Sequence, residues 1–561
     1  MFKKWRLKAA QPGIEKEFAR ELGLDPLILR LLVNRGVTTP FQARSFLDPS
    51  LDGLHDPFLL KDMDKAVARL KAARERAQTV LVYGDYDVDG VTSTAVVCHL
   101  LKKLGIKALN YIPHRMEEGY GLNYEIVPLA LKWGVGLLIT VDCGVTAAGE
   151  VQSLREAGID VIVIDHHEPE GPVPAAACAV IDPKQPGCLY PFRELAGVGL
   201  AAKFVQAVLG EFPCNDLDLV ALGTIADVVP LRGENRIIVR HGLPVIGNSP
   251  KAGVQALIEA ARVRGKEMTP HLVGFSLGPR LNAAGRMGSA ATALELLLSD
   301  DPAVAAGLVN ILEVHNRERQ RLQGAVVDEA VDIIEADTVL AGGRIIVVHK
   351  EGWHKGVLGI AASRIVEKYG RPAFVISLEG GVGVGSARSV EGFHLNEALA
   401  SCAHMLEGFG GHKRAAGLRV RQESLGALRE GLNRFAQGVF ADGVPDSVLE
   451  IDSQLSLASL NMELVAMMEG LAPFGEGNPA PVFATRRLVV KSRPQLLGRD
   501  TLKFWVTDGQ VSVSAVGFSM AAEFGSLRMG EAVDIAYTLG IDDWNKAPTA
   551  QIMLKDIRPA K

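Results

Sequence analysis

Three short apolar runs, each ending beside acidic or histidine residues, constrain the fold more than any other feature of this sequence. The runs are Thr79–Tyr83, Gly136–Val141 and Asp160–Ile164, and stretches of helical pattern separate them. Continuous β-branched runs of this length are typical of parallel strands that are buried on both faces. The sequence therefore predicts an α/β domain built around a parallel sheet.

Charged side chains follow each of these predicted strands. In chain order they are Asp85, Asp87 and Asp89, then Asp142, and then Asp165, His166 and His167. Ligands of open α/β sheets bind outside the carboxyl ends of the strands, so we expect these side chains at one site. Clustered carboxylates repel one another unless cations neutralise them. The pattern therefore predicts a site for hard divalent cations such as Mg²⁺ or Mn²⁺.

The segment Asp85–Gly90 also has the D-x-D-x-D-G opening of an EF-hand loop. An EF-hand requires a glutamate at the twelfth position, which here is Val96, and the preceding segment is a predicted strand. Alone, the segment would be interpreted as a turn with solvated carboxylates. Asp227, just beyond the apolar helix-like run that includes Leu222, adds another carboxylate and favours the metal site.

Downstream segments indicate further domains. Apolar spacing predicts one long helix from Pro302 to about Asp337, connecting two lobes. A second α/β segment has strands near 344–348 and 373–377, and short alternating runs at 502–506 and 511–516 predict a small β-barrel. The expected divisions are an N-terminal helical segment at 1–45, a catalytic domain at 46–300, the helix at 301–338, a second α/β domain at 339–443 and the barrel at 444–561.

Composition limits the function classes. A chain of 561 residues exceeds one hydrophobic core, and its net charge of −5 means that any polyanion must be held by local basic patches. The six cysteines have no CxxC or disulfide-framework spacing, and no apolar run is long enough to span a bilayer. We expect a cytoplasmic enzyme without a membrane partner.

Several ordered segments give the sequence a specific resemblance. Four of them resemble the motifs of DHH phosphoesterases: Tyr83–Gly90, Val141–Gly144, Asp165–His167 and Gly223–Asp227. Gly408–His412 resembles the signature of the associated DHHA1 domain, and three further segments narrow the resemblance to RecJ exonucleases: Leu277–Arg286, Gly352–Gly359 and Ser386–Ser389. The resemblance covers nearly the whole chain.

This resemblance implies a DHH domain, a DHHA1 domain and a C-terminal OB-fold. It implies a metal-dependent 5′→3′ exonuclease that degrades single-stranded DNA to 5′-mononucleotides in repair and recombination. The implied ligands of two Mn²⁺ or Mg²⁺ ions are Asp85, Asp87, Asp89, Asp142, His166 and Asp227. Asp142 would bridge the ions. His167 would face the phosphate, or alternatively would orient His166.

The implied substrate-binding residues are Arg115, Arg280, Asn282, Arg286, His354, Ser386, Arg388, Ser389, Gly411 and His412. We predict that residues 280–286 lie in a non-helical stretch whose donors approach phosphate; surface arginines on a structural turn are the alternative. The glycine-rich run before Ser386 would let its backbone approach an anion, with Arg115 assisting at the 5′-phosphate. Gly410–His412 would contact phosphate or simply form a tight turn.

The predicted barrel carries basic residues beside two aromatics, Phe504 and Trp505. The basic residues are Arg486, Arg487, Lys491, Arg493, Arg499 and Lys503. This mixture suits a single-strand groove, and the alternative is a solvated basic face over core aromatics. The implied partners are single-strand-binding protein and a RecQ-type helicase.

Two other functions remain open at the level of sequence. One is a short-oligonucleotide or nucleotide phosphatase of the same superfamily, against which the extra β domain after Val444 argues. The other is a non-catalytic DNA-binding scaffold, against which the complete set of ligand positions argues.

Overall fold

The computed structural model describes residues 3–169, 171–441, 443–445, 448–498, 500–542 and 548–560. The chain forms two compact units, which we call the barrel unit and the two-sheet unit. The barrel unit consists of Met1–His55, Val228–Leu243 and Asp446–Lys561, and the two-sheet unit of Asp56–Asp227 and Pro244–Pro445. Among the helices that the structure describes, none is both long enough and apolar enough to cross a bilayer.

The first sheet of the two-sheet unit is parallel, as predicted. Its strand order is β3 (Ala108–Tyr111), β2 (Thr79–Gly84), β4 (Val135–Val141), β5 (Asp160–Ile164) and β6 (Ala179–Ile181). The three predicted strands are the central ones, and the β2 side chains are buried throughout. Because Gly84 pairs with Val141, and Val141 with Ile164, these strands end side by side.

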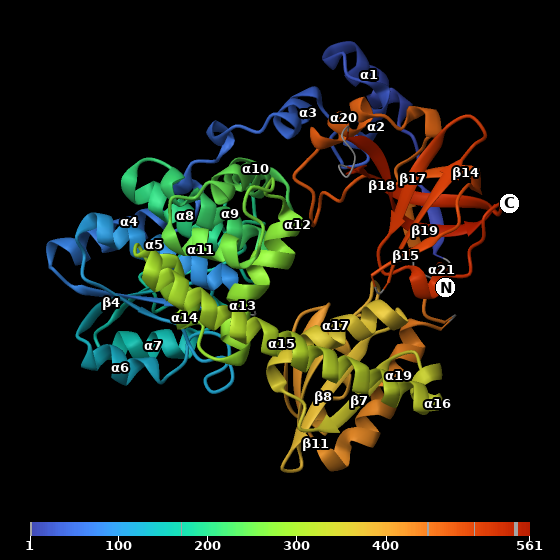
Figure 1. The fold of residues 1–561 in the computed structure, drawn as a ribbon. Helices are drawn as coiled ribbons and strands as arrows, with labels where there is room; N and C mark the ends of the chain where they lie inside the picture. Colours follow the sequence, from blue (N-terminus) through green and yellow to red (C-terminus); the bar gives the residue numbers. More distant parts are fainter. Residues whose placement is uncertain are drawn as a thin grey trace. The chain divides into compact units, whose positions relative to one another are not determined.

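Helices cover both faces of this sheet (Figure 1). They are α4 (Met63–Glu75), α5 (Val88–Leu104), α6 (Ile126–Lys132), α7 (Ala148–Glu156), α8 (Gly197–Leu209) and α9 (Leu217–Ala226). Helices α6 and α7 pack into a core with alternate side chains of the central strands, including Leu138 and Val163. Helices α4, α5 and α8 contact the sheet elsewhere, and α5, α8 and α9 contact one another.

The predicted turn after β2 is shorter than expected. Helix α5 already begins at Val88, so Asp87 is its N-cap and Asp89 lies in its first turn. The Asp87 carboxylate accepts the backbone N–H groups of Asp89 and Gly90 at 2.9 and 3.1 Å. An aspartate at this position satisfies donors that a helix start leaves free, which explains the early start.

Further helices follow in the chain. They are α10 (Gly233–Gly247), α11 (Ala252–Ala260), α12 (Pro270–Leu272), a π-helical segment (Val273–Leu277), α13 (Gly278–Met287), α14 (Ala291–Leu298), α15 (Pro302–Ala336) and α16 (Thr338–Gly342). Helix α15 confirms the predicted long helix, and Asp301 caps it by accepting the Ala303 N–H at 2.7 Å.

The non-helical interpretation of residues 280–286 is wrong, because these residues lie in α13. Pro279 stands in the first turn, where a missing N–H group costs no hydrogen bond. The small residues permit close packing: a Cβ on Gly285 would lie 2.8 Å from the Tyr86 carbonyl oxygen.

The second sheet has the order β10 (Leu406–Gly411), β11 (Ala415–Arg421), β9 (Val382–Arg388), β8 (Ala373–Glu379) and β7 (Ile346–Glu351). Only β7 and β8 are parallel among these pairs. Its helices are α17 (Leu358–Tyr369), α18 (Leu395–Ser401) and α19 (Leu425–Val439). The glycines of β9 serve sheet packing, since a Cβ on Gly383 or Gly385 would lie within 2.8 Å of Ile376.

The barrel unit confirms the predicted β-barrel. Its sheet order is β13 (Ser453–Gln454), β14 (Phe483–Val490), β18 (Ala532–Asp542), β19 (Thr549–Pro559), β17 (Ser512–Gly517), β16 (Thr501–Thr507) and β15 (Gln495–Leu497). A further pairing of β14 with β16 closes it. Its short helices include α20 (Met462–Glu469) and α21 (Ala521–Phe524).

The N-terminal region belongs to this barrel unit. Strand β1 (Lys4–Leu7) pairs in parallel with β12 (Val448–Ile451). Helices α1 (Pro12–Leu22), α2 (Pro26–Val33) and α3 (Pro40–Leu47) follow. Phe18 and Leu29 share one hydrophobic core with Phe483 and Tyr537. The buried Arg236 side chain links separate segments of this unit, because it donates hydrogen bonds to the carbonyl oxygens of Phe46, Leu471 and Ala472.

Candidate metal centre and anion pocket

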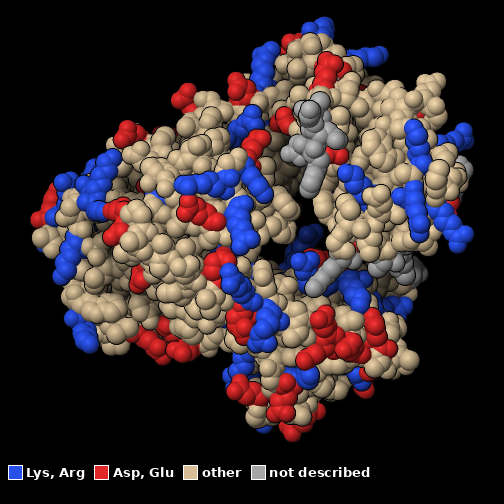
Figure 2. All heavy atoms as spheres, in the orientation of Figure 1, with Lys and Arg blue, Asp and Glu red and all other residues tan. Residues whose placement is uncertain are grey.

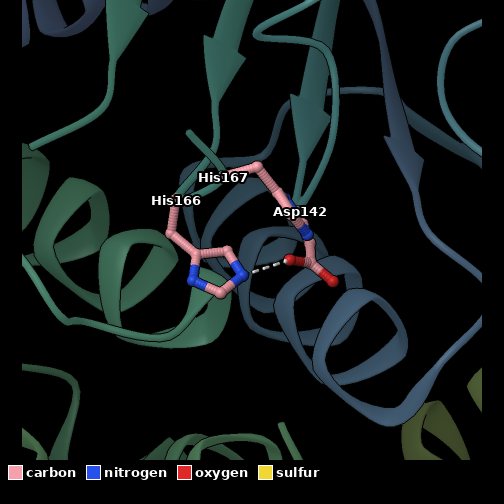
Figure 3. Close-up of side chains that lie close together, drawn as sticks. All are labelled: Asp142, His166 and His167. Carbon is pink, nitrogen blue, oxygen red and sulfur yellow. Dashed lines mark ion pairs between the residues drawn. The ribbon is translucent and has the colours of Figure 1, made fainter. Parts of the chain in front are cut away.

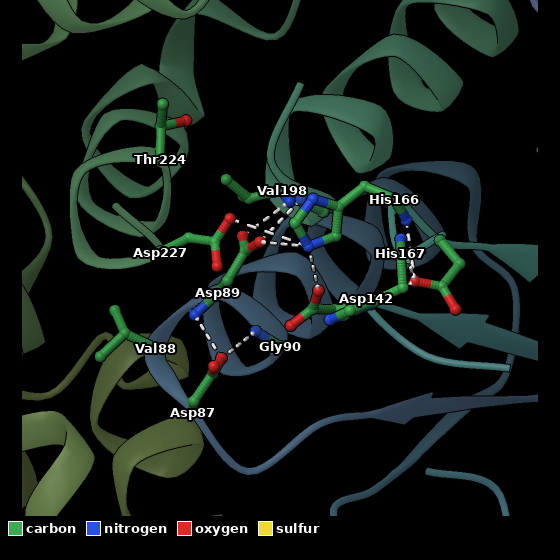
Figure 4. Close-up of polar contacts among 12 residues, drawn as sticks. Asp87, Val88, Asp89, Gly90, Asp142, His166, His167, Val198, Thr224 and Asp227 are labelled. Atoms are coloured by element: carbon green, nitrogen blue, oxygen red, sulfur yellow. Dashed lines mark hydrogen bonds and ion pairs between the residues drawn. The ribbon is translucent and has the colours of Figure 1, made fainter. Parts of the chain in front are cut away.

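The carboxyl edge of the first sheet gathers seven acidic or histidine side chains, which we call the acidic cluster; all of them except Asp85 are labelled in Figure 4. They form three overlapping groups, and within each group the ligand atoms lie within 4.8 Å of one another: Asp85, Asp87 and Asp142; Asp89, His166 and Asp227; Asp142, His166 and His167. Asp85, Asp142 and the histidine pair follow adjacent strand ends, and Asp227 ends α9. The structure thus brings together all six predicted metal ligands and His167.

The His166 ring lies at the middle of the cluster. Its Nε2 atom is 3.2 Å from Asp142 Oδ1 (Figure 3). The same atom is 3.7 Å from Asp227 Oδ2 and 3.9 Å from Asp89 Oδ2 (Figure 4). A backbone hydrogen bond with Leu195 holds the ring. Burial, followed by the neighbouring His167, lowers the pKa of His166 to about 3, so the ring is neutral and able to act as a ligand.

The pKa values of the clustered carboxyl groups show that no positive charge among the described residues neutralises them. Burial, followed by repulsion from neighbouring carboxylates, raises the pKa values of Asp85, Asp89 and Asp142 well above the ordinary range. The same causes raise the pKa of Asp227 to about 7. Without a cation, these groups therefore retain protons at a pH where free aspartates are ionised.

Unpaired atoms inside the cluster indicate what would fill it. Four of the buried side-chain atoms without a hydrogen-bond partner among the described residues are Asp85 Oδ1, Asp142 Oδ1, His166 Nε2 and Asp227 Oδ2. Buried polar atoms normally have partners, so these lone pairs favour a positively charged ligand. A set of carboxylate oxygens with one imidazole nitrogen suits Mn²⁺ or Mg²⁺, and the residues present fit such ions.

His167 and Asp165 form a second pair beside the cluster. The His167 Nδ1 atom lies 2.7 Å from Asp165 Oδ1, and the two backbone N–H groups of Val145 and His166 also donate to Asp165 at 2.9 and 2.8 Å. Burial opposes the charge on His167, but the hydrogen bond to Asp165 outweighs it and raises the pKa to about 9. His167 is therefore cationic at neutral pH, and its ring also packs at 4.5 Å against that of His166. The sequence reasoning missed the anchoring position of Asp165.

The start of α8 completes the centre and was also missed. Asp89 accepts the backbone N–H groups of Gly197 and Val198 at 2.7 and 2.8 Å. A Cβ on Gly197 would lie 2.7 Å from Asp142 Oδ1, so only glycine fits there. The run Gly197-Val-Gly199 was the available signal in the sequence.

The backbone of Asp142 is left-handed, with φ at 61°. Non-glycine residues adopt this conformation rarely, and it costs energy that surrounding structure must offset. Its N–H donates to the Ile164 carbonyl at 2.9 Å, which holds the residue at the strand edge. The strained backbone aims the carboxylate into the cluster.

A group of arginines lies beside this centre. The Arg115 guanidinium lies 4.8 Å from the centre of the Tyr86 ring. Tyr86 stands between Asp85 and Asp87 in the sequence. Arg286 donates to the Gly356 carbonyl at 3.1 Å. Burial, followed by repulsion from Arg115 and Arg319, lowers the pKa of Arg286 to about 9, and burial followed by Arg115 lowers that of Arg388.

The surroundings of these arginines favour an anion. Within the described part of the chain, no ion pair joins Arg115, Arg286 or Arg388 to a carboxylate. A Cβ on Gly359, in the first turn of α17, would lie 2.9 Å from Arg388 and 3.5 Å from Ser386 Oγ. The positive end of α17 therefore adjoins these arginines. We call the group of Arg115, Arg286, Arg388 and Ser386 the anion pocket. Arg319 was missed because it lies in the polar run of α15.

Several other predicted substrate residues have structural contacts. Arg280 forms an ion pair with Glu313 and donates to the Ser276 carbonyl. Ser389 Oγ donates to the Phe393 carbonyl at 2.7 Å, and His354 Nδ1 accepts the Gly356 N–H at 3.1 Å. Asn282 is half-buried in α13, one turn before Arg286.

The glycine-histidine segment is a tight hairpin in the structure. Gly411 has φ at 134°, and a Cβ there would lie 2.5 Å from the Ala415 carbonyl oxygen. His412 is exposed, and its N–H donates to the same carbonyl at 2.8 Å. The hairpin explains the glycine without any ligand.

Phe504 and Trp505 have different environments in the barrel. Phe504 is buried in the core, whereas Trp505 is 46% exposed. Arg486, Arg487, Lys491 and Arg493 are exposed, and Figure 2 shows Lys and Arg side chains projecting from the strand-rich part. Lys503 lies 3.6 Å from Asp542. Arg499 lies outside the described residues.

The raised pKa values predict a pH-dependent response to metal. Because the folded, metal-free protein holds protons that the unfolded chain has lost, its stability falls as pH rises from about 4 towards 7. A divalent ion must displace those protons, so Mn²⁺ should raise the thermal midpoint by about 5 °C at pH 8 and far less at pH 5. Thermal unfolding with Mn²⁺ or EDTA between pH 5 and pH 8 measures this effect. Equal Mn²⁺-induced shifts of the thermal midpoint at pH 5 and pH 8 would contradict the predicted ligands.

The chain matches three family profiles. They are the DHH family N-terminal domain at residues 79–224, the DHHA1 domain at 342–438 and the RecJ OB domain at 451–556. The single-stranded-DNA-specific exonuclease RecJ of Bacillus subtilis is 38% identical, over 99% of this chain and 70% of its own length.

Two solved structures from Thermus thermophilus are also similar. RecJ in complex with Mn²⁺ has a TM-score of 0.85 and 32% identity, covering 100% of this chain and 80% of that one. RecJ in complex with Mg²⁺ has a TM-score of 0.80 and 30% identity, covering 100% and 79%. The predicted order of an α/β DHH domain, a DHHA1 domain and an OB domain is confirmed.

Proposed function

The chain belongs to the RecJ family of single-stranded-DNA-specific exonucleases, and from this premise we propose that it removes nucleotides stepwise from the 5′ end. It is a hydrolase that acts on single-stranded DNA with Mn²⁺ or Mg²⁺. The family acts in DNA repair. The polarity, the release of 5′-mononucleotides and the role of each residue are the parts that we propose.

The contact between the acidic cluster and the anion pocket supports this polarity most directly. Arg115 lies over the ring of Tyr86, and its charge also acts on Asp85. A terminal phosphate carries more negative charge than a phosphodiester, so a group of half-buried arginines without carboxylate partners among the described residues favours a phosphorylated chain end over an internal phosphodiester. A 5′-phosphate held there places the first phosphodiester near the acidic cluster.

We propose that two divalent ions are held by Asp85, Asp87, Asp89, Asp142, His166 and Asp227, with Asp142 between them. When bound, such ions stabilise the attacking and leaving oxygens of an in-line displacement. His167, held cationic by Asp165, stabilises negative charge that develops on the scissile phosphate. Asp89, fixed by the N-terminus of α8, keeps its side of the cluster rigid.

In the anion pocket, we propose that Arg115, Arg286, Arg388 and Ser386 bind the 5′-phosphate. On the barrel, exposed Trp505 and the basic residues near it would bind single-stranded DNA by stacking and charge. Phosphate contacts by Asn282, His354, Ser389, Gly411 and His412 stay predictions, as do the domain divisions at 45, 300, 338 and 443. Arg280 would act mainly by bracing α13 against α15.

Single-strand-binding protein and a RecQ-type helicase are proposed partners, and the cytoplasm is the proposed location. The family relationship supports these proposals, since a single-strand nuclease needs exposed strands. Nothing in the acidic cluster favours the scaffold, because every predicted ligand position holds a ligand-type side chain.

Single-stranded DNA labelled at either end tests the proposed function. We expect labelled mononucleotide at once from a 5′ label and only late from a 3′ label, with Mn²⁺ or Mg²⁺ and not with EDTA. A blunt duplex of the same sequence is the control and should persist. Early release from the 3′ label would refute the polarity, and activity confined to the shortest oligonucleotides would favour the phosphatase.

A further inference from the structure

One loop supplies side chains to both parts of the site. Between β3 and α6, it carries Arg115 to the anion pocket and Tyr120 to the histidine pair. The Tyr120 hydroxyl lies 3.1 Å from Nδ1 and 3.3 Å from Nε2 of His167. Both residues also contact Tyr86: Arg115 lies over the face of its ring, and the Tyr120 ring packs against it edge to face.

This loop has no regular secondary structure to hold it. Gly119 and Gly121, which flank Tyr120, both have left-handed φ values of 85° and 87°. Glycines lose much conformational entropy when fixed, so side-chain contacts must offset that cost.

The Glu118 carboxylate meets three donors from both ends of the loop. Its Oε1 atom accepts the His114 N–H at 2.6 Å. Its Oε2 atom accepts the Tyr111 hydroxyl at 2.8 Å and the Asn123 side-chain amide at 3.1 Å. Because Tyr111 ends β3, Glu118 ties the loop to the sheet.

A second layer of hydrogen bonds extends this attachment. The Asn123 amide also donates to the Tyr83 hydroxyl at 3.1 Å, and that hydroxyl donates to the Gly121 carbonyl at 2.9 Å. Tyr83 is fully buried in β2, the strand that leads directly to Asp85. The loop is therefore fixed to the strand that carries the first predicted metal ligand.

We propose that Glu118 is a positioning residue, which orders this loop so that Arg115 reaches the 5′-phosphate and Tyr120 reaches His167. The proposal rests on the proposed function, because it assigns Arg115 to the 5′-phosphate. Glu118 acts through these residues, since both of its oxygens are already engaged within the protein.

An amide cannot replace this carboxylate. Glutamine offers only one acceptor oxygen. Its NH₂ group would take the place of the other carboxylate oxygen and would face N–H or O–H donors, with which it cannot form a hydrogen bond as acceptor. Glu118→Gln therefore leaves at least one donor unpaired and loosens the loop. The matched control is Glu117→Gln, which makes the same charge change on the same loop at a side chain that is 80% exposed and 3.9 Å from its nearest partner, His114.

The test compares kcat/KM on 5′-phosphorylated and 5′-hydroxyl single strands. We expect Glu118→Gln to lower the preference for 5′-phosphate about tenfold, and Glu117→Gln to leave it unchanged. The double variant Arg115→Ala/Glu118→Gln should lose no more preference than Arg115→Ala alone, because both changes remove the same contact.

Each result has a defined meaning. If Arg115→Ala keeps the preference, the proposed phosphate role of Arg115 is wrong. If Arg115→Ala loses it while Glu118→Gln keeps it, the positioning role alone is overturned. Should Glu118→Gln fail to fold, Tyr111→Phe removes a single donor to Glu118; a several-fold loss of preference is expected, and an unchanged preference overturns the proposal.

Discussion

Asp142→Asn should lower the rate of DNA hydrolysis by at least about a thousandfold. Asp142 belongs to two of the three ligand groups, and asparagine removes its negative charge while keeping its shape. Asparagine also tolerates the left-handed backbone that Asp142 adopts, so the loss would come from chemistry and not from misfolding. The measurement is kcat on single-stranded DNA with saturating Mn²⁺, together with the Mn²⁺-induced shift in thermal midpoint.

Asp182→Asn is the matched control for this experiment. Asp182 follows β6 at the same sheet edge, is fully buried, and has a pKa raised to about 7 by burial. It accepts the Lys184 N–H at 2.6 Å, which an asparagine oxygen can also accept. We expect activity within about twofold of the parent. Comparable losses in both variants would show that the acidic edge is needed for folding and would contradict the specific role of Asp142.

Arg388→Ala should reduce kcat/KM on 5′-phosphorylated strands by about a hundredfold and have little effect on 5′-hydroxyl strands. Arg388 has no carboxylate partner in the described structure and lies beside the positive end of α17. Its removal would take away the charge-assisted contact that we propose for the 5′-phosphate. Steady-state kinetics on the two substrates measure the effect.

Arg419→Ala is the control that tests whether the loss of any arginine from this sheet lowers kcat/KM. Arg419 lies on the adjacent strand β11, is 61% exposed and is paired with Glu407 at 2.9 Å. We expect its replacement to leave both substrates nearly unaffected. An equal loss from Arg419→Ala would mean that general charge, and not the anion pocket, attracts the DNA.

Local patterns were sufficient to predict the acidic edge of the first sheet. An apolar run that stops at an aspartate defines both the strand and the position of the side chain after it. Parallel neighbours in register then bring Asp85 and Asp142 together without further information. This is why the cluster was predictable although its members are far apart in sequence.

Contacts between distant segments were not predictable in the same way. Nothing near Arg280 indicates that Glu313, on another helix, would pair with it. The glycines and alanines around residue 285 suggested an irregular stretch, because their packing against Tyr86 was invisible. Phe504 and Trp505 were distinguishable in principle, since Leu502, Phe504 and Val506 alternate inward along one strand.

The composition of the barrel unit has a consequence for the newly made chain. Strand β1 leaves the ribosome long before its pairing partner β12, which begins at Val448, so β1 cannot pair until more than 400 further residues have been made. The apolar face that includes Phe18 and Leu29 stays uncovered during this time. The sheet that carries the acidic cluster is complete long before. A chain truncated before residue 446 would therefore contain every strand of the sheet that carries the acidic cluster, together with an uncovered apolar N-terminal segment, but none of the barrel strands.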